Sequence, residues 1–265
     1  MMRTRWWHWV LGTYAILGIW VLGGPVVGTL AVIILEPADG GWRELAVQLS
    51  TFIAFFVATP LIWRYLLKRP VIQLVTDRPR INWRRVGEGF GIWFGLSLLS
   101  GAIDYTLNRD AYRFSFSLAA FIPFAVVALL LLPIQTTAEE LFFRGWIIQW
   151  ARRLPTIAVV AISGAVFSLP HLGNPEAAGS EIPALIAWFV LGAGWAYVSV
   201  RDRSIELAVG AHLANNLFAI LLVGYDNAVL PTSSVLTTAD LNLEGTAIAL
   251  TVLMAIFIRL TRPRT

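Results

Sequence analysis

The stretch SFSLAAFIPFAVVALLLLPIQTTAEELFFR, residues 115–144, decides the fold class of this chain. Its first part, residues 115–135, is almost wholly apolar and has the length of roughly 20 residues that a helix needs to cross a bilayer. Two adjacent glutamates and an arginine follow it. Charged groups in a membrane span are costly, so they mark a candidate functional site by default. The stretch therefore indicates a membrane helix that leads into a polar site.

The composition of the whole chain also indicates a membrane protein. Of the 265 residues, 57% are hydrophobic and 14% are charged, against about 25% charged residues in soluble domains. A soluble globule could not cover so much apolar surface with so few charges, which excludes a soluble enzyme, a disordered chain and a water-soluble binding module. The net charge of +4 is divided among short clusters, which argues against nucleic-acid binding. The sequence has no cysteine, so disulfides and thiolate metal sites are excluded.

Seven more apolar runs accompany residues 115–135, and they predict an all-α integral membrane bundle of about eight transmembrane helices. The runs are 9–35, 45–67, 86–107, 156–169, 182–200, 205–224 and 246–260. The runs 156–169 and 246–260 are short for a span. None has the alternation of a barrel strand, and helices satisfy their own backbone groups in lipid. We expect a single polytopic membrane domain over 1–265, with the motif-bearing core at 115–224.

The basic residues predict the orientation of the bundle. Seventeen of the twenty Lys and Arg residues fall on one side of the eight spans. These are Arg3, Arg5, Arg64, Lys68, Arg69, Arg78, Arg80, Arg84, Arg85, Arg144, Arg152, Arg153, Arg201, Arg203, Arg259, Arg262 and Arg264. The other side has Arg43, Arg109 and Arg113. Because basic loops stay in the cytoplasm, both termini are predicted to be cytoplasmic. The sequence shows no extended soluble loop and no targeting features, so we expect a prokaryotic plasma membrane.

The first candidate site follows Pro133. Glu140 and Arg144 are four residues apart and can form an ion pair on one helix face. Glu139 lies about 100° round the helix from Glu140 and has no such partner. Pro133 interrupts the span, and residues 136–139 have the form of a capping box, so a new helix with acidic residues in its first turn is predicted here. Glu139 is therefore either a general base in a partly apolar setting or part of an ordinary helix start.

Two histidine motifs supply further candidate groups. Phe167 and His171 share one helix face at the end of an apolar run, and His212 and Asn216 share one face inside another. The alternatives are a histidine that hydrogen-bonds a carbonyl group at a helix end, and polar contacts that hold helices together.

The spacing along the chain allows these motifs to meet. Glu139 and His171 each lie sixteen residues from Pro155, so they can face each other across an antiparallel helix pair. The segment 173–181 is too polar to continue through lipid. We expect that segment either to line a wet cavity or to lie at the far surface.

Glu-Glu-x-x-x-Arg at 139–144, Phe-x-x-x-His at 167–171 and His-x-x-x-Asn at 212–216 together resemble the signature of the CAAX protease and bacteriocin-processing family. That family includes the type II CAAX prenyl endopeptidases and the abortive-infection-type membrane proteins. The resemblance covers Glu139 to Asn216. It implies an intramembrane glutamic endopeptidase on an eight-helix fold, which cuts a peptide bond near the cytoplasmic membrane surface, in a cavity that opens to the cytoplasm.

The resemblance also implies catalytic roles for four matched residues. Glu139, assisted by His171, would activate the attacking water. His212 and Asn216 would form the oxyanion hole for the tetrahedral intermediate. This division agrees with the chemistry of amide hydrolysis, which needs a base for water and donors at the developing oxyanion.

The remaining matched residues have structural roles by the same resemblance. Glu140 with Arg144 would fix the local helix geometry, and Phe167 would support the histidine motif. No cofactor is implied. The expected partners are a membrane-associated protein or peptide substrate, including a lipidated one, and the lipid bilayer, with no nucleic acid.

Other functions fit part of the pattern. Glu139, His171 and His212 could be the ligands of a zinc-dependent membrane protease, although no His-Glu-x-x-His sequence is present. A non-catalytic membrane immunity or scaffold protein would keep these residues as packing. A transporter would use intramembrane Glu and His in a proton relay, but the sequence shows no internal repeat.

Overall fold

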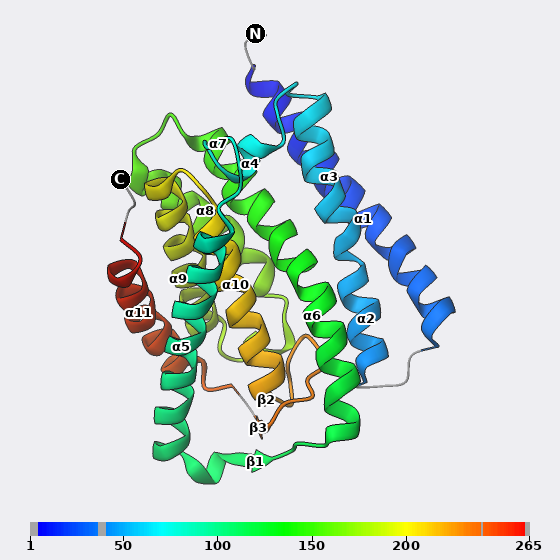
Figure 1. The fold of residues 1–265 in the computed structure, drawn as a ribbon, viewed down its shortest axis with the longest axis vertical. Coiled ribbons are helices and arrows are strands. Elements are labelled where there is room, and N and C mark those ends of the chain that lie inside the picture. Colours follow the sequence, from blue (N-terminus) through cyan, green and yellow to red (C-terminus); the bar gives the residue numbers. More distant parts are fainter. Residues whose placement is uncertain (1–4, 37–40, 240, 263–265) are drawn as a thin grey trace.

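The structure is a computed structural model that describes residues 5–36, 41–239 and 241–262, so Arg3 and Arg264 lie outside the described residues. Its helices form an elongated bundle (Figure 1). The longer helices are α1 (Trp6–Leu35), α2 (Trp42–Ser50), α3 (Phe52–Tyr65), α5 (Trp83–Leu107), α6 (Leu118–Glu140), α8 (Thr156–His171), α9 (Glu181–Asp202), α10 (Glu206–Leu217) and α11 (Leu243–Leu260). The shorter elements are α4 (Ile72–Val75), α7 (Ile147–Ala151), the π-helical segments Leu141–Trp146 and Phe218–Leu222, and the strands β1 (Tyr112–Phe114), β2 (Val223–Tyr225) and β3 (Leu236–Thr238).

Six helical stretches among the described residues are long and apolar enough to cross a membrane. They are Trp6–Leu35, Trp42–Tyr65, Trp83–Leu107, Leu118–Ala151, Glu181–Asp202 and Leu243–Leu260. Thr156–His171 and Glu206–Leu222 are shorter apolar helices. The predicted helical bundle with about eight helices is thus confirmed, with six candidate spans. The last helix, α11, has 18 residues and is long enough for a candidate span. The seventh apolar run forms the shorter helix Glu206–Leu222, because the chain turns into β2 directly after it.

The surface of the bundle suits contact with lipid. On α1, large apolar side chains such as Leu22 and Ile34 are 75% and 76% exposed, whereas Gly24 and Gly28 are buried against the neighbouring helix. This arrangement reverses that of a soluble helix. It matches membrane helices, which pack through small residues and turn their large apolar side chains outward.

The fourth span differs from the prediction. Helix α6 continues through Pro133 to Glu140 and then, by the π-helical segment, into α7. The Thr136 hydroxyl donates to the Leu132 carbonyl oxygen at 2.8 Å, so it does not cap a helix start. Proline is tolerated in membrane helices, where neighbouring groups satisfy the freed backbone. The predicted capping box is therefore wrong, and Glu139 lies inside a helix next to a π-helical segment, a feature frequent at functional sites.

Close packing against α5 fixes the position of α10. A Cβ atom on Gly210 would lie 2.0 Å from the Val86 carbonyl oxygen, and one on Gly89 would lie 2.3 Å from that of Leu207. Only glycine allows two backbones to approach this closely. The two glycines thus hold α10, which contains His212, directly against α5.

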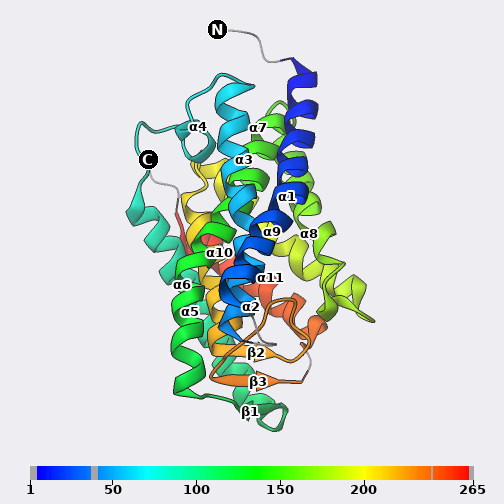
Figure 2. The same ribbon diagram turned by 90° about the vertical axis from the view of Figure 1, so that its right-hand side faces the viewer.

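A small sheet at one end of the bundle was not predicted. Strand β3 pairs antiparallel with β1 and parallel with β2 (Figure 2). Each strand has three residues, so the sequence offers no alternation long enough to detect. An ion pair between Arg113 and Asp226 adds a further link across the sheet. We call this the sheet end of the molecule.

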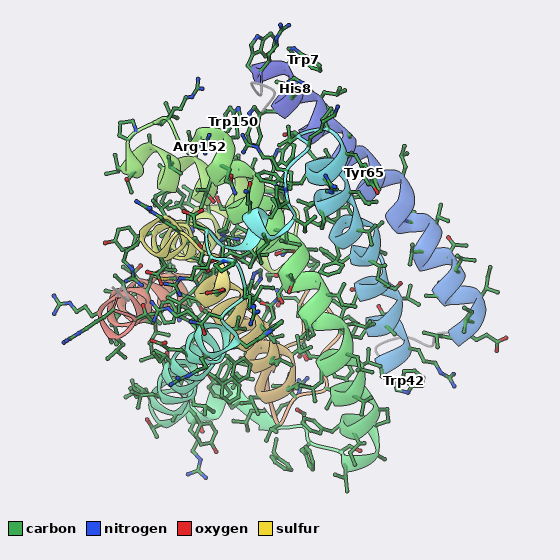
Figure 3. The ribbon with its side chains drawn as sticks, turned by 45° about the horizontal axis from the view of Figure 1, so that its top comes forward. Trp7, His8, Trp42, Tyr65, Trp150 and Arg152 are labelled. Atoms are coloured by element: carbon green, nitrogen blue, oxygen red, sulfur yellow. The ribbon has the colours of Figure 1, made fainter. Side chains whose placement is uncertain are left out.

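The opposite end is the arginine-rich end, formed by α4, α7 and the connections after α3, α7 and α9 (Figures 1 and 2). The exposed Trp7, Tyr65, Trp150 and Arg152 lie near it, while Trp42 lies at the other end of the second span (Figure 3). The backbone of Arg262 accepts a hydrogen bond from Arg85 at this end, so α11 ends here. Helix α1 begins at the same end (Figure 1). The side of the membrane that this end faces stays a prediction. Arg144 is not part of it, because its side chain is buried inside the bundle.

Candidate active site

Helices α6, α8, α9 and α10 surround a cavity of about 440 Å³, and α2 and α3 contribute to one wall. Its lining includes all four predicted catalytic residues: Glu139, His171, His212 and Asn216. The antiparallel arrangement expected for α7 and α8 therefore brings the first two motifs to one space, and α10 adds the third. The first and last of these residues, Glu139 and Asn216, are 77 positions apart in the sequence.

Glu139 is buried at the inner end of this cavity, and its two oxygens have different surroundings. The Gln135 amide donates to Oε1 at 2.7 Å, from one turn earlier on the same helix. Oε2 lies 3.5 Å from His212 Nε2 and has no hydrogen-bond partner among the described residues. The prediction of an unpartnered carboxylate is thus wrong for Oε1 and correct for Oε2. A buried, free carboxylate oxygen beside a cavity suits a general base.

His212 lies between two carboxylates. Its Nδ1 is 2.8 Å from Glu140 Oε1, and its Nε2 faces Glu139 Oε2. Ionised carboxylates only accept hydrogen bonds, so Nδ1 carries hydrogen toward Glu140. The ring stacks on Trp195, with centroids 4.6 Å apart. These contacts fix the ring and direct its Nε2 toward the cavity.

Glu140 and Arg144 form the buried ion pair that their spacing predicted. Arg144 NH1 donates to Glu140 Oε1 at 2.8 Å, and both side chains are fully buried. Arg144 NH2 donates to the Gly192 carbonyl oxygen at 3.3 Å, and the guanidinium lies 4.4 Å from the Phe167 ring centroid. Glu140 therefore has a wider role than helix geometry, because the same oxygen holds both Arg144 and His212. The Phe167 ring contacts both Arg144 and His212.

His171 is oriented by its own helix. Its Nδ1 lies 2.8 Å from the Phe167 carbonyl oxygen, and a carbonyl oxygen only accepts, so Nδ1 carries hydrogen there. Its ring packs against Trp188, with centroids 5.3 Å apart. The helix-end carbonyl contact considered from the sequence is therefore present. It does not compete with a role in catalysis, because it leaves Nε2 for the cavity.

Sequence reasoning missed the amide network that joins the motifs. Asn216 Nδ2 donates to Gln135 Oε1 at 3.1 Å, and Asn215 Nδ2 donates to Asn216 Oδ1 at 3.2 Å. Trp93 Nε1 in turn donates to Asn215 Oδ1 at 3.3 Å. Gln135 could have been found from the sequence, because it lies four residues before Glu139 at the end of an apolar run.

The polar segment after α8 lines the cavity, which was one of its two predicted positions. Asn174 and Glu176 both border the space. Glu176 is buried, and it accepts hydrogen bonds from Asn174 Nδ2 at 3.1 Å and from the Val229 backbone N–H at 3.1 Å. Burial and the Glu176 carboxylate raise the pKa of Tyr225 in β2. This segment is thereby tied to the loop that follows the small sheet.

The cavity does not extend toward the arginine-rich end. From Glu139, His212 and Trp195 its lining continues to Tyr225 and Leu230 at the sheet end. The tight packing of α6, α9 and α10 beyond the motif residues closes the space on the other side. Which side of the membrane the cavity faces stays a prediction.

The zinc-ligand alternative has no matching geometry. Among residues 5–36, 41–239 and 241–262, no group of three or more His, Cys, Asp or Glu residues could hold a metal ion. His212 faces a carboxylate at each nitrogen, and His171 uses Nδ1 for a carbonyl oxygen. Glu139, His171 and His212 therefore line one cavity without forming a shared ligand set.

Fold and site together define a helical membrane protein with a buried Glu–His–Asn centre. A family model described as "Type II CAAX prenyl endopeptidase Rce1-like" matches residues 118–218, a range that contains all three motifs. The chain belongs to this Rce1-like family of type II CAAX prenyl endopeptidases. It is also 32% identical over 238 residues to a Bacillus subtilis (strain 168) protein named "Uncharacterized protein YyaK", across 84% of this chain and 80% of that one.

Proposed function

We propose that this protein is an intramembrane glutamic endopeptidase that hydrolyses a peptide bond of a membrane-associated protein or peptide. The observation that carries the proposal is the buried Glu139 carboxylate, with one oxygen held by Gln135 and the other free beside His212. Membership of an endopeptidase family supports the reaction class. The lipid bilayer, in our proposal that of a prokaryotic plasma membrane with both termini cytoplasmic, surrounds the site.

Water activation is assigned to Glu139 and His171. Glu139 Oε2 accepts a proton from a water molecule in the cavity, while His171 Nε2 accepts the hydrogen bond of the second hydrogen and orients it. The hydroxide forms a bond to the carbonyl carbon of the substrate. The tetrahedral intermediate then breaks its C–N bond, and the proton on Glu139 passes to the leaving amine. No atom or charge is left unbalanced.

Oxyanion stabilisation is assigned to His212 and Asn216. Because His212 Nδ1 already carries a hydrogen toward Glu140, the oxyanion role requires the imidazolium form, in which both ring nitrogens are donors. The 3.5 Å contact between His212 Nε2 and Glu139 is longer than a good hydrogen bond, so a substrate oxygen can compete for the Nε2 hydrogen. The Asn216 amide has two hydrogens, and Gln135 takes one of them. Its other hydrogen can reach the oxyanion. Each such donor supplies about 10²–10³ in rate in comparable enzymes.

Glu140 and Gln135 are positioning residues in this scheme. Glu140 fixes the Nδ1 side of the His212 ring and is itself neutralised by Arg144. Gln135 holds Glu139 through its amide N–H and Asn216 through its carbonyl oxygen. One amide thus sets the separation between the base and an oxyanion donor.

The test compares peptide termini in the membrane proteome of cells that express the wild type, Glu139→Gln or Glu244→Gln at equal levels. Glu244 is an exposed residue in the first turn of α11 and provides the matched control. We expect new termini with the wild type and the control, and none with Glu139→Gln. Identical termini in all three would refute the proposal and would favour the non-catalytic immunity or scaffold function. Loss of the termini after metal chelation, with the variants otherwise as expected, would favour the zinc-dependent protease.

A further inference from the structure

The cavity that holds Glu139 contains a second carboxylate, which the reaction scheme does not use. Glu176 lies in the polar turn after α8, five residues beyond His171, and it lines the same space. The residue is buried, with an exposed fraction of 6%. A buried charged group in the wall of a cavity that receives a peptide is a candidate for substrate recognition.

The contacts of Glu176 fit an ionised carboxylate. Its Oε1 accepts a hydrogen bond from Asn174 Nδ2 at 3.1 Å, and its Oε2 accepts one from the Val229 backbone N–H at 3.1 Å. The Tyr225 hydroxyl, in the same lining, is a third donor to this group. All three neighbours are neutral, so they hold the carboxylate in place without cancelling its charge. A carboxylate has about four acceptor sites, so these donors leave room for a further one.

The cavity lining has no basic side chain that balances this charge. Among the described residues that line the cavity there is no Lys or Arg. The three arginines assigned to the sheet end, Arg43, Arg109 and Arg113, lie outside the lining, and Arg113 is paired with Asp226. His171 accepts a hydrogen bond through Nε2 in the reaction scheme and is therefore neutral there.

The charges around the catalytic groups balance one another. Arg144 is positive, and His212 is positive in the imidazolium form that the oxyanion role requires. These two cations match the two carboxylates of Glu139 and Glu140. Among the described residues of the lining, Glu176 is then the charge that stays uncompensated.

The remaining walls of the cavity strengthen its attraction for a cation. Trp188, Ile220 and Leu230 make part of the lining apolar, and charges interact more strongly in such surroundings than in water. Trp188, which packs against His171, also provides an aromatic ring, whose face attracts cations. An ammonium or guanidinium group in the cavity therefore meets favourable partners, whereas a substrate carboxylate meets charges of its own sign.

We propose that Glu176 is a specificity-determining residue that selects substrates with a lysine or arginine side chain close to the scissile bond, and that the cavity disfavours aspartate and glutamate there. This inference rests on the proposed function for the cleavage itself. An extended peptide advances about 3.3 Å per residue, so a cavity of about 440 Å³ accommodates only a few residues on either side of the bond.

The first test measures peptide binding and needs no catalysis. Full-length protein with Glu139→Gln is immobilised in a neutral detergent and incubated with a synthetic random-sequence peptide pool that is blocked at both ends. Retained peptides are sequenced by mass spectrometry for this protein and for the same protein with Glu176→Gln or Glu181→Gln added. Glu181 is an exposed carboxylate in the first turn of α9, outside the cavity lining, and provides the matched control.

We expect the Glu139→Gln protein and the control to retain basic peptides in preference to acidic ones. Peptides with Lys or Arg should exceed those with Asp or Glu by about tenfold or more, which is the contribution of a hydrogen bond to a charged group. With Glu176→Gln added, this ratio should fall to that of the pool. Equal ratios for the Glu176→Gln and Glu181→Gln proteins, or the retention of no peptide by any of them, would overturn the inference.

A second pair of variants tests the same charge if Glu176→Gln does not fold. Val229 is 44% exposed, and its backbone N–H contacts the Glu176 carboxylate. Val229→Lys adds an ammonium group at this position, whereas Val229→Met adds a side chain of similar length without charge. We expect Val229→Lys to lose the preference for basic peptides and Val229→Met to keep it. The same preference in both variants would contradict the role of Glu176.

The two proposals fail in different ways. A preference for basic peptides in the binding test, without Glu139-dependent peptide termini in the membrane proteome, refutes the protease alone. Glu139-dependent termini with the same flanking residues in the wild type and in Glu176→Gln refute the selectivity and leave the protease standing.

Discussion

Replacing Arg144 by methionine removes one partner of an ion pair that has no access to solvent. The exposed fraction of both side chains, Arg144 and Glu140, is 0%. The variant loses the 2.8 Å bond to Glu140, the 3.3 Å bond to the Gly192 carbonyl oxygen and the contact with the Phe167 ring. Breaking a buried pair by removing one partner costs about 3–5 kcal/mol, because the other charge stays buried.

The expected loss of folding stability in Arg144→Met can be measured as a fall in Tm. At about 2–4 °C per kcal/mol for a chain of this size, the Tm of Arg144→Met should fall by roughly 6–20 °C. Thermal unfolding in detergent, followed by tryptophan fluorescence, gives this value. Arg113→Met is the control, since its pair with Asp226 is 60% and 46% exposed and should contribute at most about 1 kcal/mol.

A double variant separates stability from positioning. Glu140→Leu combined with Arg144→Leu replaces the whole pair by apolar side chains, which is often neutral for stability. We expect much of the Tm to return, while proteolysis stays lost because His212 Nδ1 has no carboxylate partner. Equal Tm values for Arg144→Met and Arg113→Met would refute the energetic reasoning. A proteolytically active double variant would refute the positioning role of Glu140.

Three further predictions concern the oxyanion hole, the helix packing and the sheet end. Asn216→Ala should lower kcat by about 10²–10³ with little change in KM, measured on a substrate identified from the peptide termini; a change in KM alone would contradict an oxyanion role. Gly210→Ala should lower the free energy of unfolding by about 1–3 kcal/mol, because the new Cβ would lie 2.0 Å from a carbonyl oxygen of α5. The control Gly91→Ala has open space around it and should leave stability unchanged, and thermal unfolding of both variants tests this difference. The raised pKa of Tyr225 means that the folded state favours the protonated hydroxyl. The hydroxyl therefore stabilises the folded protein fully below about pH 10, the ordinary pKa of tyrosine, and this stabilisation is lost as the pH rises through the higher pKa of the folded state. Tyr225→Phe should remove that alkaline loss in unfolding measured against pH, and an unchanged profile would show that the hydroxyl contributes nothing.

The helices could be predicted from the sequence because burial in lipid leaves a direct trace in composition. Each span had to be apolar on nearly all faces, so its position could be found without knowledge of its neighbours. The prediction failed at Pro133, where local propensity indicates a helix boundary and the bundle instead maintains a continuous helix. The three-residue strands also escaped prediction, because each is too short to show alternation and β1 pairs with a strand more than one hundred residues away.

The candidate site was predictable as a set of residue types and only partly as an arrangement. The sequence by itself determined a helical membrane protein, its family motifs and the pairing of Glu140 with Arg144, since four-residue spacing places two side chains on one face. Tertiary structure alone decided that Glu140 also holds His212, that Gln135 links Glu139 to Asn216, and that the cavity runs toward the sheet end. Those features depend on how helices that are distant in the sequence pack together and on where their side chains leave a cavity. Neither can be predicted from a local sequence pattern.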